Sequence, residues 1–139
     1  VIGGSNDSRD PLGYSNETYV FALKVKTGEI VWTSPTIGSP VGIAVSNGVA
    51  VVSGWRNSAV VGFDAETGKR LWQFVLDPIS AFPVDPMPVA ISGNGVFFGT
   101  ANGGGFFRLN IMSGKKEWQN VKVSSDSPCV IARSNIFVV

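Results

Sequence analysis

The side chains best suited to bind a ligand form one short run in this sequence. Trp55, Arg56 and Asn57 are consecutive. An indole beside a guanidinium group can stack on a ligand and donate paired hydrogen bonds to an anion. Isolated aromatic residues are also common on protein surfaces. We therefore favour Trp55 as a loop residue that covers the rim of the fold, with a binding site as the alternative.

Acidic side chains are the candidate ligands for a metal ion. Asp7, Asp10, Asp77, Asp85 and Asp126 fall in predicted loops and have no regular spacing. Calcium requires roughly six to eight oxygen ligands, which scattered acids do not establish. Solvated loop carboxylates are the favoured interpretation.

The sequence predicts no catalytic residue. It contains no histidine, which excludes histidine-ligated zinc and Ser-His-Asp or Cys-His chemistry within this chain. Cys129 is the one cysteine, and we expect it to be a small buried hydrophobe of an inner strand. The Gly103-Gly104-Gly105 run lacks the following helix of a phosphate-binding loop, so we expect a turn.

Charge and composition exclude other classes. Lys and Arg total 11 against 10 Asp and Glu, a net charge of +1, so no basic excess predicts nucleic-acid binding. Hydrophobic residues make up 44%, but no run is long enough to span a membrane. Glycosylation sequons begin at Asn6 and Asn16. Such sequons often arise by chance, and their use is left open.

An internal repeat predicts the elements that position these residues. Three segments carry a hydroxyl residue, a glycine, three further residues and a tryptophan. They are Thr27–Trp32, Thr67–Trp72 and Ser113–Trp118. The tryptophans stand 40 and 46 residues apart, the spacing of a four-stranded propeller blade.

A second signature lies between these segments. Pro40, Pro88 and Pro128 each precede a short apolar run, then a turn rich in Asn and Gly, then another β-prone run. Asn-Gly between two such runs strongly indicates a hairpin. In the middle unit the pattern predicts four strands, named A to D in chain order, at 41–46, 49–54, 59–64 and 69–75, and no window predicts a helix.

The predicted fold class is all-β, a β-propeller of four-stranded antiparallel blades. The expected divisions are a partial blade at 1–35 with the end of strand B and strands C and D, full blades at 36–76 and 77–122, and strands A and B at 123–139. Known propellers close with about four to eight blades. About three blade equivalents predict a partial propeller, whose remaining blades come from a longer chain or from other subunits. A start at Val1 fits a processed chain or one cut from something longer.

The repeat resembles the tryptophan-docking motif of quinoprotein, or PQQ-like, propellers, with consensus Ala-x-Asp-x-x-Thr-Gly-x-x-x-Trp. The resemblance implies that each motif tryptophan packs over the glycine of a neighbouring motif and that an acid and a threonine brace the turn. The implied residues are Trp32, Trp72, Trp118, Gly28, Gly68, Gly114, Asp64 and Thr67. Asn110 with Ser113 is a milder brace, whereas Lys24 replaces the acid and Arg108 the small first residue.

In such a propeller the B–C and D–A loops share one face, and loops often carry function. The candidate partner face contains Trp55, Arg56, Asn57 and Asn102. We expect a binding or scaffold module that presents this face to a protein or carbohydrate, without catalysis in this chain.

The resemblance also leaves two alternatives for the function. One is a fragment of a PQQ-dependent alcohol or sugar dehydrogenase, with PQQ and Ca²⁺ bound by the parent, although the vicinal cysteine pair of those enzymes is missing from this sequence. The weaker alternative is an outer-membrane assembly factor of the same repeat family. The resemblance and the sequons favour an extracytoplasmic location.

Overall fold

A computed structural model describes residues 2–5, 18–36, 38–55, 58–77 and 84–139 of the chain. Within them the structure is all-β, with one short 3-10 turn, η1, at Ala101–Gly103. Asn102 inside η1 has φ 62°, a left-handed conformation that breaks the turn. The prediction of an all-β propeller segment with antiparallel strands is confirmed.

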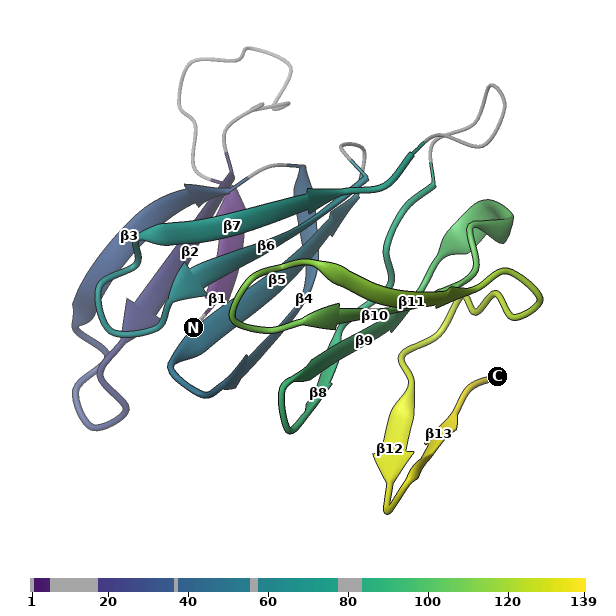
Figure 1. Ribbon diagram of the computed structural model, residues 1–139. Helices are drawn as coiled ribbons and strands as arrows, with labels where there is room; N and C mark the ends of the chain where they lie inside the picture. The colour runs from purple at the N-terminus through teal and green to yellow at the C-terminus, as the bar shows by residue number, and fades with distance from the viewer. Residues whose placement is uncertain (1, 6–17, 37, 56–57, 78–83) are drawn as a thin grey trace, which may run out of the picture.

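The described strands form four sheets in chain order (Figure 1). The first sheet contains β1 (Ile2–Ser5), β2 (Thr18–Leu23) and β3 (Ile30–Thr36). The second contains β4 (Ser39–Ser46), β5 (Val49–Trp55), β6 (Ala59–Asp64) and β7 (Arg70–Val75). The third contains β8 (Ala90–Ser92), β9 (Gly95–Gly99), β10 (Phe106–Asn110) and β11 (Lys116–Asn120). The fourth pairs β12 (Val130–Ala132) with β13 (Asn135–Phe137).

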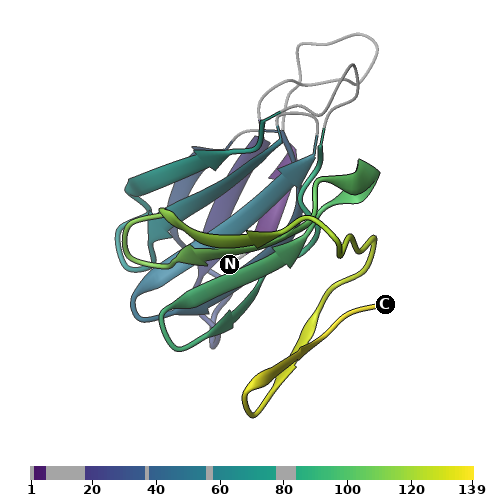
Figure 2. The same ribbon diagram turned by 45° about the vertical axis from the view of Figure 1, so that its right-hand side comes forward.

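In each sheet the strands follow one another in an antiparallel meander. The four strands predicted in the middle unit correspond to β4–β7, with β4 beginning earlier, at Ser39. Figure 2 shows the sheets stacked one beside the next, with the β12–β13 hairpin against the β8–β11 sheet. This is the stacking of propeller blades.

The C and D strands of the three repeats share one irregularity. The register shifts after Ala22, Gly62 and Arg108, at the same place in β2–β3, β6–β7 and β10–β11. A β-bulge bends a strand and redirects its side chains. In each repeat the residue before the shift lies opposite a motif tryptophan, Trp32, Trp72 or Trp118.

The hydrophobic core lies between the sheets. One cluster joins the first and second sheets through residues such as Val20, Trp32 and Phe63. A larger one joins the second and third, including Val51, Phe98, Phe107, Leu109 and Ile111. Because the second sheet is covered on both faces, β5 is buried from Val49 to Gly54 without alternation.

The two ends of the sheets differ. The tight turns that follow β2, β4, β6, β8 and β10 lie at one end, which we call the turn end. Trp55 at the end of β5 and η1 lie at the other, the loop end (Figure 1). No helix among the described residues is long and apolar enough to cross a membrane.

Candidate functional site

Two tryptophans lie directly on glycines of the next sheet. A Cβ built on Gly68 would stand 2.6 Å from indole carbons of Trp32, and one on Gly114 would stand 2.5 Å from those of Trp72. Both glycines have positive φ, +75° and +67°, a conformation that glycine adopts without a steric penalty. Only a residue without a side chain therefore fits beneath each ring.

Each docked indole also makes a hydrogen bond to the neighbouring turn. Trp32 Nε1 donates to the carbonyl oxygen of Ala65 at 3.1 Å, and Trp72 Nε1 donates to that of Ile111 at 2.7 Å. In both cases the acceptor lies three residues before the docking glycine. A buried indole N–H needs such a partner, so the ring and its polar edge are both satisfied by one turn.

The glycine turns share one backbone geometry. The amides of Gly28, Gly68 and Gly114 donate to the carbonyls of Lys24, Asp64 and Asn110 at 2.8, 2.9 and 2.8 Å. The Gly28 turn is therefore formed like the other two, with φ +73°, but a Cβ on Gly28 would have no heavy atom within 4 Å. No described tryptophan lies on this glycine.

A side-chain brace holds two of these turns. Asp64 Oδ1 accepts hydrogen bonds from the Thr67 hydroxyl and amide, both at 2.8 Å, and from the Glu66 amide at 3.1 Å. Bonds from Thr67, first its hydroxyl and then its amide, hold the pKa of Asp64 below its usual value. Asn110 Oδ1 accepts from the Met112 and Ser113 amides at 3.0 and 3.2 Å.

The first turn uses another contact. Lys24 stands where the acid stands in the second repeat, and its Nζ lies 2.7 Å from Glu29 Oε2 across the turn. Both side chains are more than half exposed, so the pair contributes little to stability. The backbone bonds and Gly28 hold this turn.

Two inter-sheet contacts could not be read from the motif. The Ser34 hydroxyl donates to the carbonyl of Gly68 beside the docked Trp32. Asn47 Nδ2 donates to the Gly93 carbonyl at 3.0 Å and to Asn94 Oδ1 at 3.2 Å. Ser34 has no counterpart in the other repeats, and the Asn47-Gly48 pair indicated only a hairpin. Nothing in the sequence indicated that the Asn47 side chain also bonds to the neighbouring sheet.

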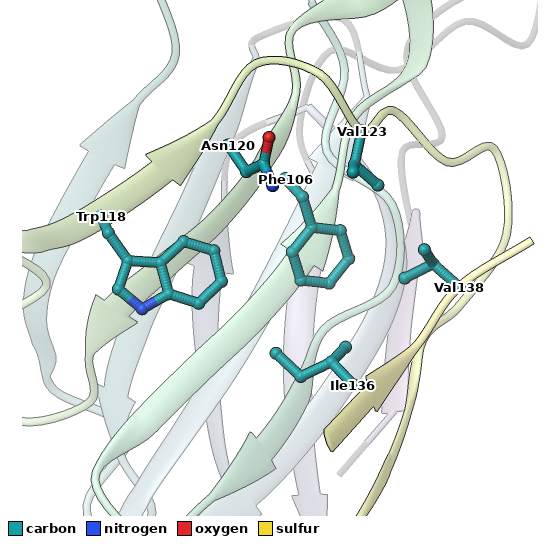
Figure 3. A pocket seen from close by; sticks show the side chains of 6 residues that line it. All are labelled: Phe106, Trp118, Asn120, Val123, Ile136 and Val138. Atoms are coloured by element: carbon teal, nitrogen blue, oxygen red, sulfur yellow. The ribbon is translucent and has the colours of Figure 1, made fainter. Parts of the chain in front are cut away.

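Trp118 lies at the edge of the third sheet. It is 37% exposed, against 9% for Trp32. Its ring centroid lies 6.3 Å from that of Phe106 and 6.1 Å from that of Phe97. Together with Ile136 and Val138 of the hairpin, Trp118 and Phe106 line an open cavity of about 190 Å³ (Figure 3).

Arg108 gives the third repeat its own contacts. Arg108 Nε lies 2.6 Å from Glu117 Oε2, an ion pair between β10 and β11. The guanidinium carbon also lies 5.5 Å from the centre of the Phe97 ring. Where the other repeats have Ala22 and Gly62, this repeat places a charged side chain opposite its tryptophan.

The predicted partner face is described only in part. Trp55 ends β5 and is 46% exposed, and Asn102 lies in η1 at the same end. Arg56 and Asn57 lie outside the described residues, as do Asp7, Asp10 and both sequon asparagines. Whether the candidate residues form one surface therefore remains a prediction.

The described part of the chain contains no cluster of three or more His, Cys, Asp or Glu side chains able to hold a metal ion. Asp77 and Asp126 are exposed and Asp85 is partly buried.

Cys129 lies just before β12 and is 7% exposed. It belongs to a small cluster with Phe97 and Phe106. Burial raises the pKa of the thiol, so Cys129 packs as a hydrophobe in an environment that disfavours the reactive thiolate.

Antiparallel sheets stacked through tryptophan-on-glycine contacts define a β-propeller segment of the quinoprotein type. The family model described as outer membrane protein assembly factor BamB, of the PQQ-like repeat type, matches residues 12–139. The chain belongs to this PQQ-like repeat family. No curated protein sequence matches the chain significantly.

Solved structures show the same fold. BamB from Moraxella catarrhalis is 22% identical with a TM-score of 0.66, over 89% of this chain and 36% of BamB. A quinohemoprotein alcohol dehydrogenase from Comamonas testosteroni is 20% identical with a TM-score of 0.59, over 74% of this chain and 19% of the enzyme. The computationally designed Ika4 protein is 14% identical with a TM-score of 0.65, over 88% of this chain and 78% of Ika4. The chain therefore spans only about a third of BamB.

Proposed function

We propose that this chain is a non-catalytic propeller segment that presents its loop end to a protein partner. The observation that carries the proposal is that the contacts between sheets described above are concentrated at one end of the sheets. Both tryptophan-on-glycine contacts use turn-end glycines, Gly68 and Gly114. In the described residues the loop end has none of these docking contacts, so its sequence can vary without loss of this joint.

Trp55 is the residue of this end that best suits a protein interface. It is 46% exposed, whereas the docked Trp32 is 9% exposed. Tryptophan and arginine are enriched among the residues that contribute most to protein interfaces, and Arg56 follows Trp55 directly in the sequence. The proposed site is the Trp55–Asn57 segment together with Asn102.

The family supports a protein partner and an extracytoplasmic location. Its description is that of an outer membrane protein assembly factor. We infer that the partner is a component or a substrate of outer-membrane protein assembly, met on the outer side of the cytoplasmic membrane. Fold alone does not determine function, so the partner requires a direct test.

Photo-crosslinking in the source cells tests this proposal. A photoreactive phenylalanine analogue replaces Trp55 in the parent protein, and mass spectrometry identifies its crosslinks. The matched control carries the same analogue at Met112, which is 57% exposed but lies at the turn end. Crosslinks to an outer-membrane assembly protein from position 55 alone would support the proposal. Equal capture from both positions, or none from position 55, would contradict it.

The dehydrogenase alternative has a separate test. The alcohol dehydrogenases of similar structure are at most 20% identical in sequence to this chain. This likeness supports a common fold. Calorimetric titration of the full-length parent with PQQ and Ca²⁺ distinguishes the two functions. Saturable binding would favour a PQQ-dependent enzyme, and a folded parent that gives no heat would favour the scaffold.

A further inference from the structure

The second and third sheets enclose a small pocket that the repeat itself does not require. Its volume is about 100 Å³, and its walls include Phe74 of β7, Phe107 of β10, and Lys116 and Gln119 of β11. In the first sheet, Ser34 holds the place of Phe74, two residues after the motif tryptophan. Ser34 bonds to the neighbouring turn, whereas Phe74 packs edge-on against Phe107, with ring centroids 6.0 Å apart.

The chain is also longer beside this pocket. Pro40 follows Trp32 by 8 positions, but Pro88 follows Trp72 by 16. Insertions in repeat proteins map to loops on one face, which is often the binding face. Asp77, which belongs to the longer connection, lines the pocket. The pocket thus lies where the chain departs from its own repeat.

The floor of the pocket is apolar. Leu76, Val84 and Phe107 line it and are buried. The backbone of Gly104 forms part of the wall and lies against Val84, because a Cβ on Gly104 would stand 2.2 Å from Val84 Cγ1. Sites for drug-sized ligands measure roughly 300–1,000 Å³. A pocket of this size therefore suits one small molecule in place of several waters.

Two opposite charges stand at the rim of the pocket. Lys116 and Asp77 both line it and are exposed, yet no ion pair between described residues joins them. Lys116 Nζ donates to Gln119 Oε1 at 3.0 Å and lies 6.0 Å from the centre of the Phe107 ring. Gln119 Nε2 in turn donates to the Gly104 carbonyl at 2.9 Å. These bonds orient the ammonium group beside the apolar floor, with a neutral amide as its acceptor.

We propose that this pocket binds a small aliphatic amino acid as a zwitterion. The carboxylate of the ligand pairs with Lys116, its ammonium group pairs with Asp77, and its side chain packs on the floor. Hydrogen bonds between charged groups are stronger than neutral ones. A ligand with a single charge would attract one rim residue and repel the other, so the pair of charges favours a zwitterion. The site is separate from the Trp55–Asn57 segment and does not depend on the proposed protein partner.

An NMR titration of the full-length parent with L-leucine tests the proposal. We expect saturable shifts of the Gly104 backbone amide and the Gln119 side-chain amide, with a dissociation constant of about 1 mM or lower, which is within reach of a ligand of this size. The amide of Gly68, in a turn at the other end of the sheets, should not shift. A folded parent whose Gly104 and Gln119 signals stay unchanged at about ten times that concentration would overturn the proposal.

Analogues of leucine test the two charges separately. Isocaproate lacks the ammonium group and leucinamide lacks the carboxylate, and we expect each to bind at least about tenfold more weakly than leucine. N-acetylleucinamide has neither charge and should bind more weakly than leucine by at least the same factor. Equal binding of N-acetylleucinamide and leucine would show that the pocket takes an aliphatic group alone, which would refute the proposal.

Variants of the rim assign the charges to residues. Lys116→Met keeps most of the side-chain length, and Asp77→Asn keeps the shape, so each removes one charge from the rim. We expect each to weaken leucine binding at least about tenfold. The matched controls are Lys115→Met and Asp126→Asn, which alter exposed residues outside the pocket and should leave binding unchanged. Binding that is equal in the pocket variants and their controls would contradict the proposed roles of Lys116 and Asp77.

Discussion

The indole N–H of Trp72 donates a 2.7 Å hydrogen bond to the carbonyl of Ile111, 39 residues further along the chain. The same ring lies on Gly114, three residues after that acceptor. One side chain of the second sheet thus contacts the turn of the third at two points. Trp32 makes the equivalent contacts with Ala65 and Gly68, so the relationship is a repeated inter-blade joint.

Removal of the docked ring should be costly. We expect Trp72→Ala to lower the free energy of unfolding by about 3–5 kcal/mol, because a large aromatic side chain leaves a cavity between the sheets. Trp55→Ala should lower it by less than about 1 kcal/mol, because Trp55 is half exposed at the rim. Urea denaturation measures both. Equal losses would contradict the assignment of docking and rim positions.

The indole hydrogen bond can be separated from the ring. Trp72→Phe keeps an aromatic ring near Gly114 but leaves the Ile111 carbonyl without this donor. A net hydrogen bond contributes roughly 0.5–1.5 kcal/mol, and the smaller ring adds a packing loss. We expect a loss between those of Trp55→Ala and Trp72→Ala in the same urea experiment. A loss equal to that of Trp72→Ala would show that an aromatic ring without the indole N–H contributes nothing to stability at this position.

A side chain on a docking glycine should collide with its tryptophan. Gly114→Ala places a Cβ about 2.5 Å from Trp72 and also strains a turn with φ +67°. Backbone strain costs roughly 1–2 kcal/mol, and overpacking adds about 1–3 kcal/mol. Gly48→Ala, with φ +74° and no atom within 4 Å, should show the strain alone. Thermal unfolding of the two variants measures the difference, and equal melting temperatures would disprove the close contact.

The Asp64 brace should respond to acid. Its pKa is lowered in the folded state by the Thr67 hydroxyl and amide. A carboxyl group whose pKa falls on folding stabilises the protein above its unfolded pKa, and this contribution disappears as the pH drops through the folded pKa. Thr67→Val removes the hydroxyl donor and should raise the pKa of Asp64. Carboxyl carbon NMR titration of wild type and variant measures it, and an unchanged pKa would exclude the bond.

Cys129 should be protected from thiol reagents. It is 7% exposed, and burial raises its pKa, which lowers the thiolate fraction near neutral pH. We expect its reaction with an aromatic disulfide at pH 8 to be at least about tenfold slower in the folded chain than in denaturant, a factor equivalent to 1.4 kcal/mol. The absorbance of the released thiolate follows the reaction. Equal rates would place the thiol at the surface.

The sequence predicted the fold because its signals are local and repeated. The spacing of Trp32, Trp72 and Trp118 indicated four-stranded units, and Asn47-Gly48 marked the β4–β5 hairpin. Turn glycines and alternating strands depend on backbone sterics that neighbouring residues decide. Such features can be recognised without knowledge of the rest of the chain.

The candidate site was less predictable because its contacts cross between sheets. The Ser34–Gly68 bond and the Asn47–Gly93 bond join residues whose types recur elsewhere without such roles. Trp55 was predicted as a loop residue but is the last residue of β5, and its partner depends on a surface outside the chain.

The asymmetric contact at each joint gives the middle blade a special position. Among the described blades, β4–β7 alone both receives a docked indole, on Gly68, and donates one, from Trp72. In repeat architectures stability is close to a sum of unit and nearest-neighbour terms. In the isolated 139-residue segment, fraying should therefore begin in the first and third sheets, and the amides of β5 and β6 should exchange with solvent last. The middle blade therefore stabilises both of the sheets beside it.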